Sequence, residues 1–327
     1  MRDDSIDSIK GGLIFLVVLG HCLSLGNAED TRILHNMIYC FHMPLFVFLS
    51  GYFTKKNERL ISGIKSVFET FIVFHIYYII VTCSFPHTLY DLITPQWIYW
   101  YLLSLVFWRL LVLYLPFDKW NKTIVVSVAI VIAIIIGFIP LIGYPLSLSR
   151  TIIFFPFFIL GYYGKYNLII DNIRSTRKFS CLFFMVCCLL ISLVILPDLS
   201  RVFAGSFPYA SQNVYFCHPA VTRVLFYVIA ILMSITFIKL IPDNKFLAEV
   251  GRNTMLFYVY HSFMIYLAKL LSSQLGVDSW SVLALSCFAT FIMCIVWITK
   301  KWRIHQYILH PISNIIENIK SNNTKIK

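Results

Sequence analysis

The segment 10-KGGLIFLVVLGH-21 decides the fold of this chain, because it places two ionisable residues on one long apolar stretch. Lys10 and His21 are eleven residues apart, which is three helical turns at about 100° per residue. Their side chains would share one helix face, about 16 Å apart. In a membrane helix the cation would lie at one surface and the imidazole near mid-bilayer. An ionisable group at that depth is costly and is by default a functional-site hypothesis.

The composition extends this interpretation to the whole chain. Of the 327 residues, 59% are hydrophobic and 13% are charged, whereas a soluble domain has about 25% charged residues. Apolar runs of about 17 residues or more, long enough to cross a bilayer, recur along the sequence. We therefore expect an all-α fold, a polytopic transmembrane helical bundle in which helices satisfy the backbone polar groups. No secretory signal peptide is expected at the polar N-terminus.

The hydrophobic runs predict about ten spans, and together they make one membrane domain without internal repeats. Residues 1–299 form this membrane-embedded domain, and residues 300–327 form a basic cytoplasmic tail whose apolar period predicts a helix along the surface. The predicted spans are 10–26, 33–53, 63–84, 97–115, 123–143, 150–165, 179–197, 219–241, 254–273 and 279–299.

The charge distribution predicts the topology. The net charge is +12, but the basic residues cluster in alternate connections between apolar runs, which is the positive-inside pattern and not evidence for a nucleic-acid partner. Both termini are therefore expected in the cytoplasm. The basic residues that carry this prediction include Lys55, Lys56, Arg59, Lys65, Lys119, Lys122, Lys165, Arg174, Arg177, Lys178, Lys300, Lys301 and Arg303.

Cysteines and aromatic residues receive structural interpretations. The nine cysteines lie mostly inside apolar stretches and form no CxxC pair, so we expect small buried hydrophobes, with no disulfide framework and no metal site. Trp97, Tyr99, Trp100 and Tyr101 crowd the outer start of the fourth span, as an interfacial aromatic belt would.

A second histidine is predicted at the depth of His21. His42 lies about nine residues, or roughly 13 Å, into a span that descends from outside. Adjacent antiparallel helices would then bring both imidazoles to one cavity in a hydrocarbon core about 30 Å thick. The alternative is two buried histidines that are hydrogen-bonded to the backbone or to each other.

Several other charged residues have two readings each. Asp7 precedes Lys10 by three residues, so the two form either a solvated interfacial ion pair or an acid that orients Lys10 toward a cytoplasmic anion. Glu69 and Arg109 lie in neighbouring spans and are expected to pair structurally; otherwise they line a cavity. Arg223, near the outer surface, is expected to snorkel toward water.

Four segments resemble a known family. Asp7-x-x-Lys10-Gly11, followed by an apolar run ending in Gly20-His21, resembles the first-helix motif of the acyltransferase-3 family, integral-membrane O-acyltransferases that modify surface carbohydrates. The segment 41-FHMPLFVFLSGY-52 is similar to the second-helix signature of the fucose-4-O-acetylase-like branch. Weaker similarities are Arg150 with 155-FPFFILG-161, and 251-GRNTMLFYVYH-261. Many members have Arg at position 10; Lys keeps the charge but loses bidentate geometry. The hydrolase-like domain of some members is not expected here.

The resemblance implies transfer of an acetyl group from cytoplasmic acetyl-CoA, a co-substrate and not a bound cofactor, in the plasma (inner) membrane of a bacterium. The acceptor would be a sugar hydroxyl of a surface polysaccharide or of its lipid-linked precursor. His21 would be the general base or a transient acyl acceptor, and His42 would orient it or hold the acceptor or the oxyanion. Lys10, Asp7 and Arg109 would serve the donor. The residues for the acceptor or cavity would be Arg150, Glu69, Tyr258 and His261.

Several alternatives remain open at this stage. The chain could be a proton-coupled transporter or flippase of a glycan precursor, with His21, His42 and Glu69 as a proton relay. It could also be a non-catalytic membrane scaffold. Arg150 is either a binding residue or a snorkelling interfacial arginine, and His261 is either functional or satisfied by Tyr258 and Tyr260. The aromatic loop 198–218 would be an acceptor platform or an interfacial loop.

Overall fold

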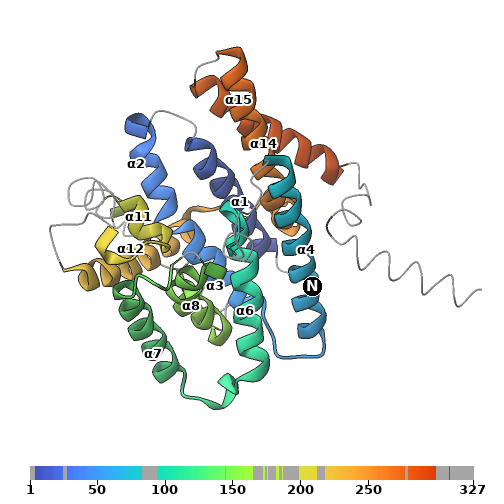
Figure 1. Ribbon diagram of the computed structural model, residues 1–327. Coiled ribbons are helices and arrows are strands. Elements are labelled where there is room, and N and C mark those ends of the chain that lie inside the picture. The colour runs from blue at the N-terminus through green and yellow to red at the C-terminus, as the bar shows by residue number, and fades with distance from the viewer. Residues whose placement is uncertain are drawn as a thin grey trace, which may run out of the picture.

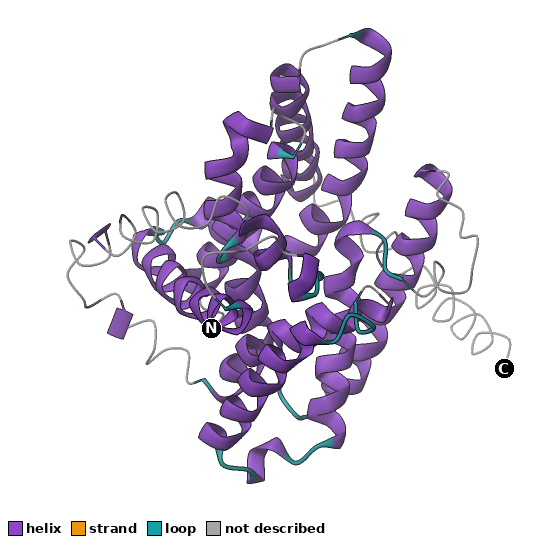
Figure 2. Ribbon diagram, turned by 60° about the vertical axis from the view of Figure 1, so that its left-hand side comes forward, coloured by secondary structure: helices purple, strands orange, loops and turns teal. Residues whose placement is uncertain are grey.

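The computed structural model describes residues 4–24, 28–82, 94–143, 145–164, 199–211, 218–276 and 279–299, together with 172, 173, 175, 182, 183, 186 and 309. Every regular element in these ranges is helical, as expected from the sequence (Figures 1 and 2). The α-helices are α1 (Asp4–Leu23), α2 (Ala28–Tyr39), α3 (His42–Phe53), α4 (Arg59–Thr82), α6 (Trp100–Tyr114), α7 (Lys122–Ile135), α8 (Leu148–Tyr163), α11 (Leu199–Ala204), α12 (Pro219–Leu240), α13 (Lys245–Arg252), α14 (Thr254–Leu275) and α15 (Ser279–Thr299). Short 3-10 turns are η1 (Trp97–Tyr99), η2 (Phe117–Lys119), η3 (Ile136–Phe138), η4 (Pro145–Ser147) and η5 (Tyr209–Ser211).

Seven helical segments of the described residues are long and apolar enough to cross a membrane: Asp4–Leu23, Thr31–Phe53, Arg59–Thr82, Trp97–Tyr114, Pro145–Tyr163, Pro219–Leu240 and Thr254–Leu271. Two shorter apolar helices, Lys122–Phe138 and Trp280–Val296, coincide with further predicted spans. The predicted span 179–197 and the tail 300–327 lie outside the described residues, apart from a few isolated positions. The count of ten spans and the cytoplasmic termini therefore stay predictions.

The second span is broken where the sequence suggested one continuous helix. α2 ends at Tyr39 and α3 begins at His42. Pro44, in the first turn of α3, has no backbone N–H to donate and tolerates only the start of a helix. The break therefore places His42 at a helix N-terminus inside the span, next to the last residue of α2.

Three of these segments reach a spanning length only by joining two elements, because the α-helix in each is too short to cross a bilayer alone. α3, α6 and α8 have 12, 15 and 16 residues, which is about 18–24 Å at 1.5 Å per residue, against a hydrocarbon core of about 30 Å. Their N-terminal ends begin at or near His42, Trp100 and Arg150, and these three residues line the same internal space. The short helices thus direct three N-termini toward one point within the bundle.

Glycines allow two pairs of helices to cross in backbone contact. A Cβ atom on Gly11 of α1 would lie 2.0 Å from the carbonyl oxygen of Leu247 in α13, and one on Gly251 would lie 1.7 Å from the carbonyl oxygen of Asp7. Gly51 of α3 and Gly161 of α8 make a second reciprocal crossing, in which each Cβ would lie 1.9 Å from a carbonyl oxygen of the other helix. Only glycine fits at these four positions.

Helix α13 occupies part of a connection that the sequence interpretation treated as a loop. The Asn244 side chain accepts hydrogen bonds from the backbone N–H groups of Phe246 and Leu247, at 2.8 and 3.3 Å, and so caps the start of this helix. The hydroxyl of Ser8 in α1 accepts a hydrogen bond from the backbone N–H of Asn244 at 3.1 Å. The same hydroxyl donates to the backbone carbonyl of Asn244 at 3.0 Å. α13 is therefore fixed to α1 at both ends of their contact.

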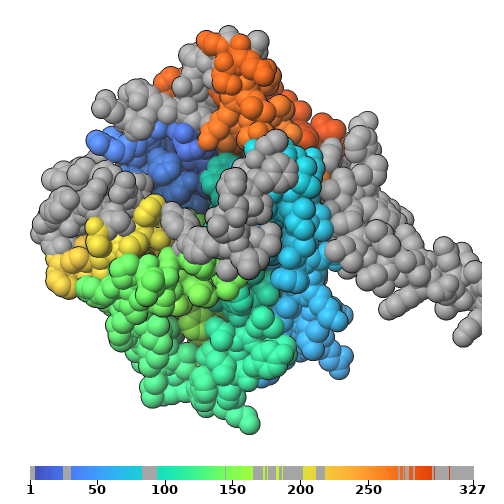
Figure 3. All heavy atoms as spheres, in the orientation of Figure 1, coloured from blue at the N-terminus to red at the C-terminus, as the bar shows by residue number. Residues whose placement is uncertain are grey.

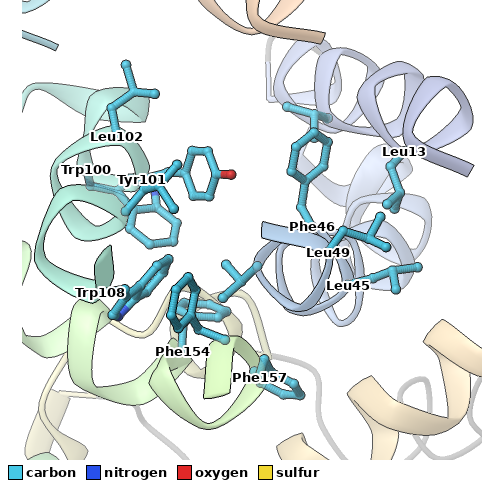
Figure 4. Close-up of a cluster of buried hydrophobic side chains, with 14 of the residues drawn as sticks. Leu13, Leu45, Phe46, Leu49, Trp100, Tyr101, Leu102, Trp108, Phe154 and Phe157 are labelled. Atoms are coloured by element: carbon cyan, nitrogen blue, oxygen red, sulfur yellow. The ribbon is translucent and has the colours of Figure 1, made fainter. Parts of the chain in front are cut away.

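Aromatic side chains build the core, and here an expectation was wrong. Tyr99, Trp100 and Tyr101 were expected at the lipid interface, but their exposed fractions are 0%, 8% and 5%. They pack inside the protein with side chains of α3 and α8, such as Phe46, Phe154 and Phe157 (Figure 4). Trp108 is also fully buried and donates from its indole N–H to the carbonyl of Thr151 at 2.9 Å. This aromatic layer ties α6 to α8.

Apolar side chains also cover much of the outside. α4, α6 and α7 lie side by side over the lower face in the space-filling view (Figure 3). Their exposed residues include Ile61, Phe68, Ile76 and Ile80 on α4 and Ile124, Val128, Val131 and Ile135 on α7. Such a large apolar outer surface fits contact with lipid tails.

Arg223 is the second structural correction. It was expected to snorkel toward the surface, but it is fully buried, and its Nη1 donates to the carbonyl of Val202 at 3.1 Å. Its guanidinium lies over the rings of Phe226 and Tyr209, at 5.5 and 5.9 Å from their centroids. The carbonyl of Val202 belongs to the last turn of α11, and a cation is favourable at the C-terminal end of a helix.

Candidate functional site

Four of the residues predicted to carry chemistry converge on one cavity of about 120 Å³. Its walls come from α1, the α2–α3 break, η1, α6, α8, α11 and α14, so distant parts of the sequence meet there. The described lining residues are His21, Tyr39, His42, Met43, Trp97, Ile98, Trp100, Arg150, Phe154, Phe203, Ala204 and Tyr258. Four of them, His21, His42, Arg150 and Tyr258, were site candidates from the sequence.

Two larger cavities are chemically different. One of about 590 Å³ lies among α6, α7 and α8, and one of about 500 Å³ lies among α3, α8 and α12. Their described lining residues include no ionisable side chain. Acid–base groups gather only around the smallest of the three cavities, which makes it the candidate active site. No three His, Cys, Asp or Glu side chains of the described residues come together as a metal site.

His21 lies in the last turn of α1 and makes a side-chain hydrogen bond. Its Nδ1 is 2.9 Å from the hydroxyl of Tyr39. The edge of its ring meets Trp97, with the ring centroids 5.2 Å apart. Because Nδ1 is engaged, Nε2 is the nitrogen that remains for a substrate group.

His42 has its tautomer set by the backbone. Its Nδ1 lies 2.7 Å from the carbonyl oxygen of Ile38. A carbonyl can only accept, so Nδ1 carries the proton and Nε2 of the neutral ring holds a lone pair. His42 is fully enclosed, with 1% of its surface exposed. Among the described residues, the side-chain hydrogen bond to His21 comes from Tyr39, and the predicted roles of His42 stay predictions.

His261 stacks on His21 from α14, with ring centroids 5.2 Å apart and planes inclined by 28°. Its Nδ1 donates to the carbonyl of Phe257 at 2.9 Å, so its Nε2 also holds a lone pair in the neutral ring. That Nε2 is buried and has no hydrogen-bond partner among the described residues. Tyr258 does not satisfy it, because its hydroxyl donates to the carbonyl of Ile98.

Arg150 holds the segment after α11 over the cavity. Its Nε donates to the carbonyl of Ala204 at 3.1 Å and its Nη2 to the hydroxyl of Ser206 at 3.2 Å. Its guanidinium lies 5.1 Å from the ring centroid of Trp100. The neighbouring Ser149 donates to the carbonyl of Gly205 at 2.7 Å. Arg150 is therefore partly buried among polar partners within the bundle.

The cavity has a positive electrostatic character. The N-terminal ends of α3, α6 and α8 reach it, and each helix N-terminus carries the positive end of a backbone dipole. Arg150 adds a full positive charge. A negative charge that develops on an oxygen atom in this space would be stabilised.

Sequence reasoning missed two neighbours of His21, namely Tyr39 and Trp97. Tyr39 precedes His42 by three residues, and the two flank the break between α2 and α3, where their ring centroids lie 4.9 Å apart. Trp97 adopts φ = 41°, in the left-handed region that a non-glycine residue rarely occupies. Such strain clusters at functional sites, and nothing in the sequence signalled it.

Comparison with known proteins assigns the family. A family model described as an acyltransferase domain matches residues 3–299. The chain belongs to the acyltransferase-3 family. A second match is the nodulation protein NolL of Sinorhizobium fredii (strain NBRC 101917 / NGR234), which is 29% identical over 187 residues. That match covers 49% of this chain and spans about half, 48%, of the relative. No solved structure matches.

In this member of the family, a charged cluster joins the start of α1 to the end of α13. Lys10 donates to Asp7 at 3.0 Å, and the Nε of Arg252 lies 3.5 Å from the other carboxylate oxygen of Asp7. Arg252 also pairs with Asp4 and with Glu249. The Glu249 and Asp4 carboxylates raise the pKa of the Arg252 guanidinium. The predicted Asp7–Lys10 pair is thus present, and Arg252 was missed.

Glu69 and Arg109 do not line the cavity. Arg109 donates from Nη1 to the carbonyl of Gly63 at 3.0 Å, and the described structure contains no ion pair between it and Glu69. Arg109 is thus held by a backbone carbonyl of α4. Glu69 is buried, with 8% exposed.

The described part of the aromatic loop 198–218 contributes Phe203 and Ala204 to the cavity wall.

Proposed function

We propose that this acyltransferase moves an acetyl group from cytoplasmic acetyl-CoA to a sugar hydroxyl of a cell-surface polysaccharide or its lipid-linked precursor. The enzyme would act in the plasma membrane of a bacterium, with ten spans and both termini in the cytoplasm. The observation that carries the proposal is the meeting of His21 and His42 at one cavity within the helical bundle. Acid–base chemistry on an alcohol needs such a group, sheltered from bulk water.

The proposed donor site lies three turns along α1 from the cavity. Lys10 and Arg252 share the carboxylate of Asp7. A donor phosphate could therefore take the ammonium of Lys10 as a partner while Arg252 continues to neutralise Asp7. The separation of about 16 Å along the helix would let the anionic part of acetyl-CoA bind at the cytoplasmic end and its thioester reach His21.

The cavity of about 120 Å³ has room for the reacting groups, an acetyl group and the attacking hydroxyl. The acceptor would approach from the side opposite the donor or from the lipid.

In the proposed reaction, Nε2 of His21 takes the proton from the sugar hydroxyl. The alcohol oxygen attacks the thioester carbon, and the carbonyl electron pair moves onto the oxygen. Collapse of this intermediate breaks the C–S bond, and the proton on His21 passes to sulfur to give the free thiol of CoA. Transfer through a transiently acylated His21 would give the same products and would reveal itself as a labelled enzyme.

Purified protein in lipid vesicles with radiolabelled acetyl-CoA and glycan from the source membrane tests the proposal. The expected result is release of free CoA together with a glycan that gains one acetyl group by mass spectrometry. Proton-driven glycan movement without acetyl-CoA consumption would instead support a transporter. Protein that neither consumes the donor nor modifies the glycan would overturn the proposed enzyme activity.

A further inference from the structure

Three side chains from different elements surround the imidazole of His21. The hydroxyl of Tyr39, at the end of α2, lies 2.9 Å from its Nδ1. His261 of α14 stacks on the imidazole, with ring centroids 5.2 Å apart and planes inclined by 28°. Trp97 of η1 lies at the same centroid distance, but its plane is inclined by 73°. The hydrogen bond fixes one atom of the imidazole, and the two ring contacts together fix its plane.

Trp97 is the member of this group with a strained backbone. Its φ of 41° lies in the left-handed region, which is costly for any residue with a β-carbon. Glycine would adopt this backbone freely but would carry no ring. The Trp97 side chain is half-buried and lines the cavity. Strain that is kept at such a place points to a role for the side chain.

Hydrogen bonds to the two residues after Trp97 hold this backbone in place. The carbonyl of Ile98 accepts a hydrogen bond from the hydroxyl of Tyr258. The hydroxyl of Tyr99 lies 2.9 Å from that of Ser262, and both are buried. Tyr258 and Ser262 belong to α14, the helix that also carries the stacked histidine. The indole therefore stands on an anchored backbone and forms a fixed wall beside the imidazole.

We propose that Trp97 is a positioning residue, which holds the imidazole of His21 in the orientation where Nε2 meets the sugar hydroxyl. This role rests on the proposed acetyl transfer. A general base must lie within hydrogen-bond reach of the proton that it takes, and a displacement of about 1 Å can lower the rate about 100-fold. Without the indole, His21 keeps its hydrogen bond with Tyr39 but loses one of the two ring contacts that fix its plane. Trp97 thus acts through His21 and exchanges no proton itself.

Trp97→Gly and Trp97→Ala both remove the ring, but only the glycine variant also relieves the strain. Each should lower kcat by about 10- to 100-fold and change the KM for acetyl-CoA and for the acceptor by less than about threefold, because a misaligned base weakens the transition state and not substrate binding. The glycine variant should melt about 2–4 °C above the alanine variant, since glycine adopts the left-handed backbone freely. Trp97→Phe keeps an aromatic ring and should recover most of the wild-type kcat.

The matched control is Trp280→Ala, which also removes a partly exposed indole. Trp280 lies in α15 and does not line the cavity, so this variant should retain the wild-type kcat per folded molecule. Wild-type kcat in Trp97→Gly, or a raised acceptor KM with unchanged kcat, overturns the positioning role while His21-dependent transfer stands. Trp97→Gly protein that melts below Trp97→Ala overturns the strained backbone on which the role rests. Wild-type protein without acetyl transfer overturns the proposed function and this role together.

Discussion

The crossing of α1 and α13 makes Gly251→Ala a severe substitution for its size. A Cβ atom at this position would lie 1.7 Å from the carbonyl oxygen of Asp7 and 3.0 Å from the backbone nitrogen of Gly11, whereas ordinary contacts begin at 3.4 Å. The helices would have to separate by about 1.7 Å, and both obstructing atoms are backbone. Overpacking usually costs about 1–3 kcal/mol, and we expect the upper end here.

Thermal unfolding of the purified protein in detergent measures this effect. A loss of about 3 kcal/mol corresponds to a fall in melting temperature of roughly 6–12 °C, at about 2–4 °C per kcal/mol. The matched control is Gly63→Ala within α4, where the nearest atom to a new Cβ is the flexible Arg109 Nη1 at 3.4 Å. That change should be neutral or stabilise by up to about 1 kcal/mol. Gly251→Ala protein that melts with the wild type would refute the close crossing.

Three further predictions concern the core and the ends of the donor path. Trp108→Ala should lower the free energy of unfolding by about 3–5 kcal/mol, because it empties a fully buried site; unchanged denaturant midpoints would contradict this. Lys10→Ala should raise the KM for acetyl-CoA by about 10- to 100-fold with little change in kcat, since a charge-assisted hydrogen bond contributes about 1.5–3 kcal/mol. Lys10→Arg keeps the charge and should bind the donor at least as well as wild type. Arg150→Gln should expose the segment 204–206 to limited proteolysis, because two of its anchoring bonds end on that segment; an unchanged digestion pattern would argue against the anchor.

The sequence predicts the helices well because membrane helices have a fixed apolar length. Asp4–Leu23, Arg59–Thr82 and Pro219–Leu240 lie where hydropathy predicts them. The shared depth of His21 and His42 follows from residue rise alone, and both line one cavity. By contrast, the break at Cys40 and Phe41 was read as continuous helix, although Pro44 signals the start of a new one.

Other features depend on tertiary packing that a sequence does not encode locally. The Trp97–Tyr101 stretch has the composition of an interfacial belt, but residues 98–101 are buried, and α6 packs against α8. Arg223 is read from the sequence as a snorkelling residue, but in the fold it donates a hydrogen bond to a carbonyl in the last turn of α11. α13 has little hydropathy signal, and its place is set by the glycine crossing with α1.

The central claim is that His21 is the reactive group of an acetyl-CoA-dependent transferase. The most direct measurement is acetyl transfer by purified His21→Ala protein in vesicles, compared with wild type and with His75→Ala. His75 is a matched control because it is also a buried histidine, but it accepts from the backbone N–H of Gln96 and does not line the cavity. We predict no measurable transfer by His21→Ala and full transfer per folded molecule by His75→Ala. Transfer by His21→Ala at the wild-type rate would contradict the account.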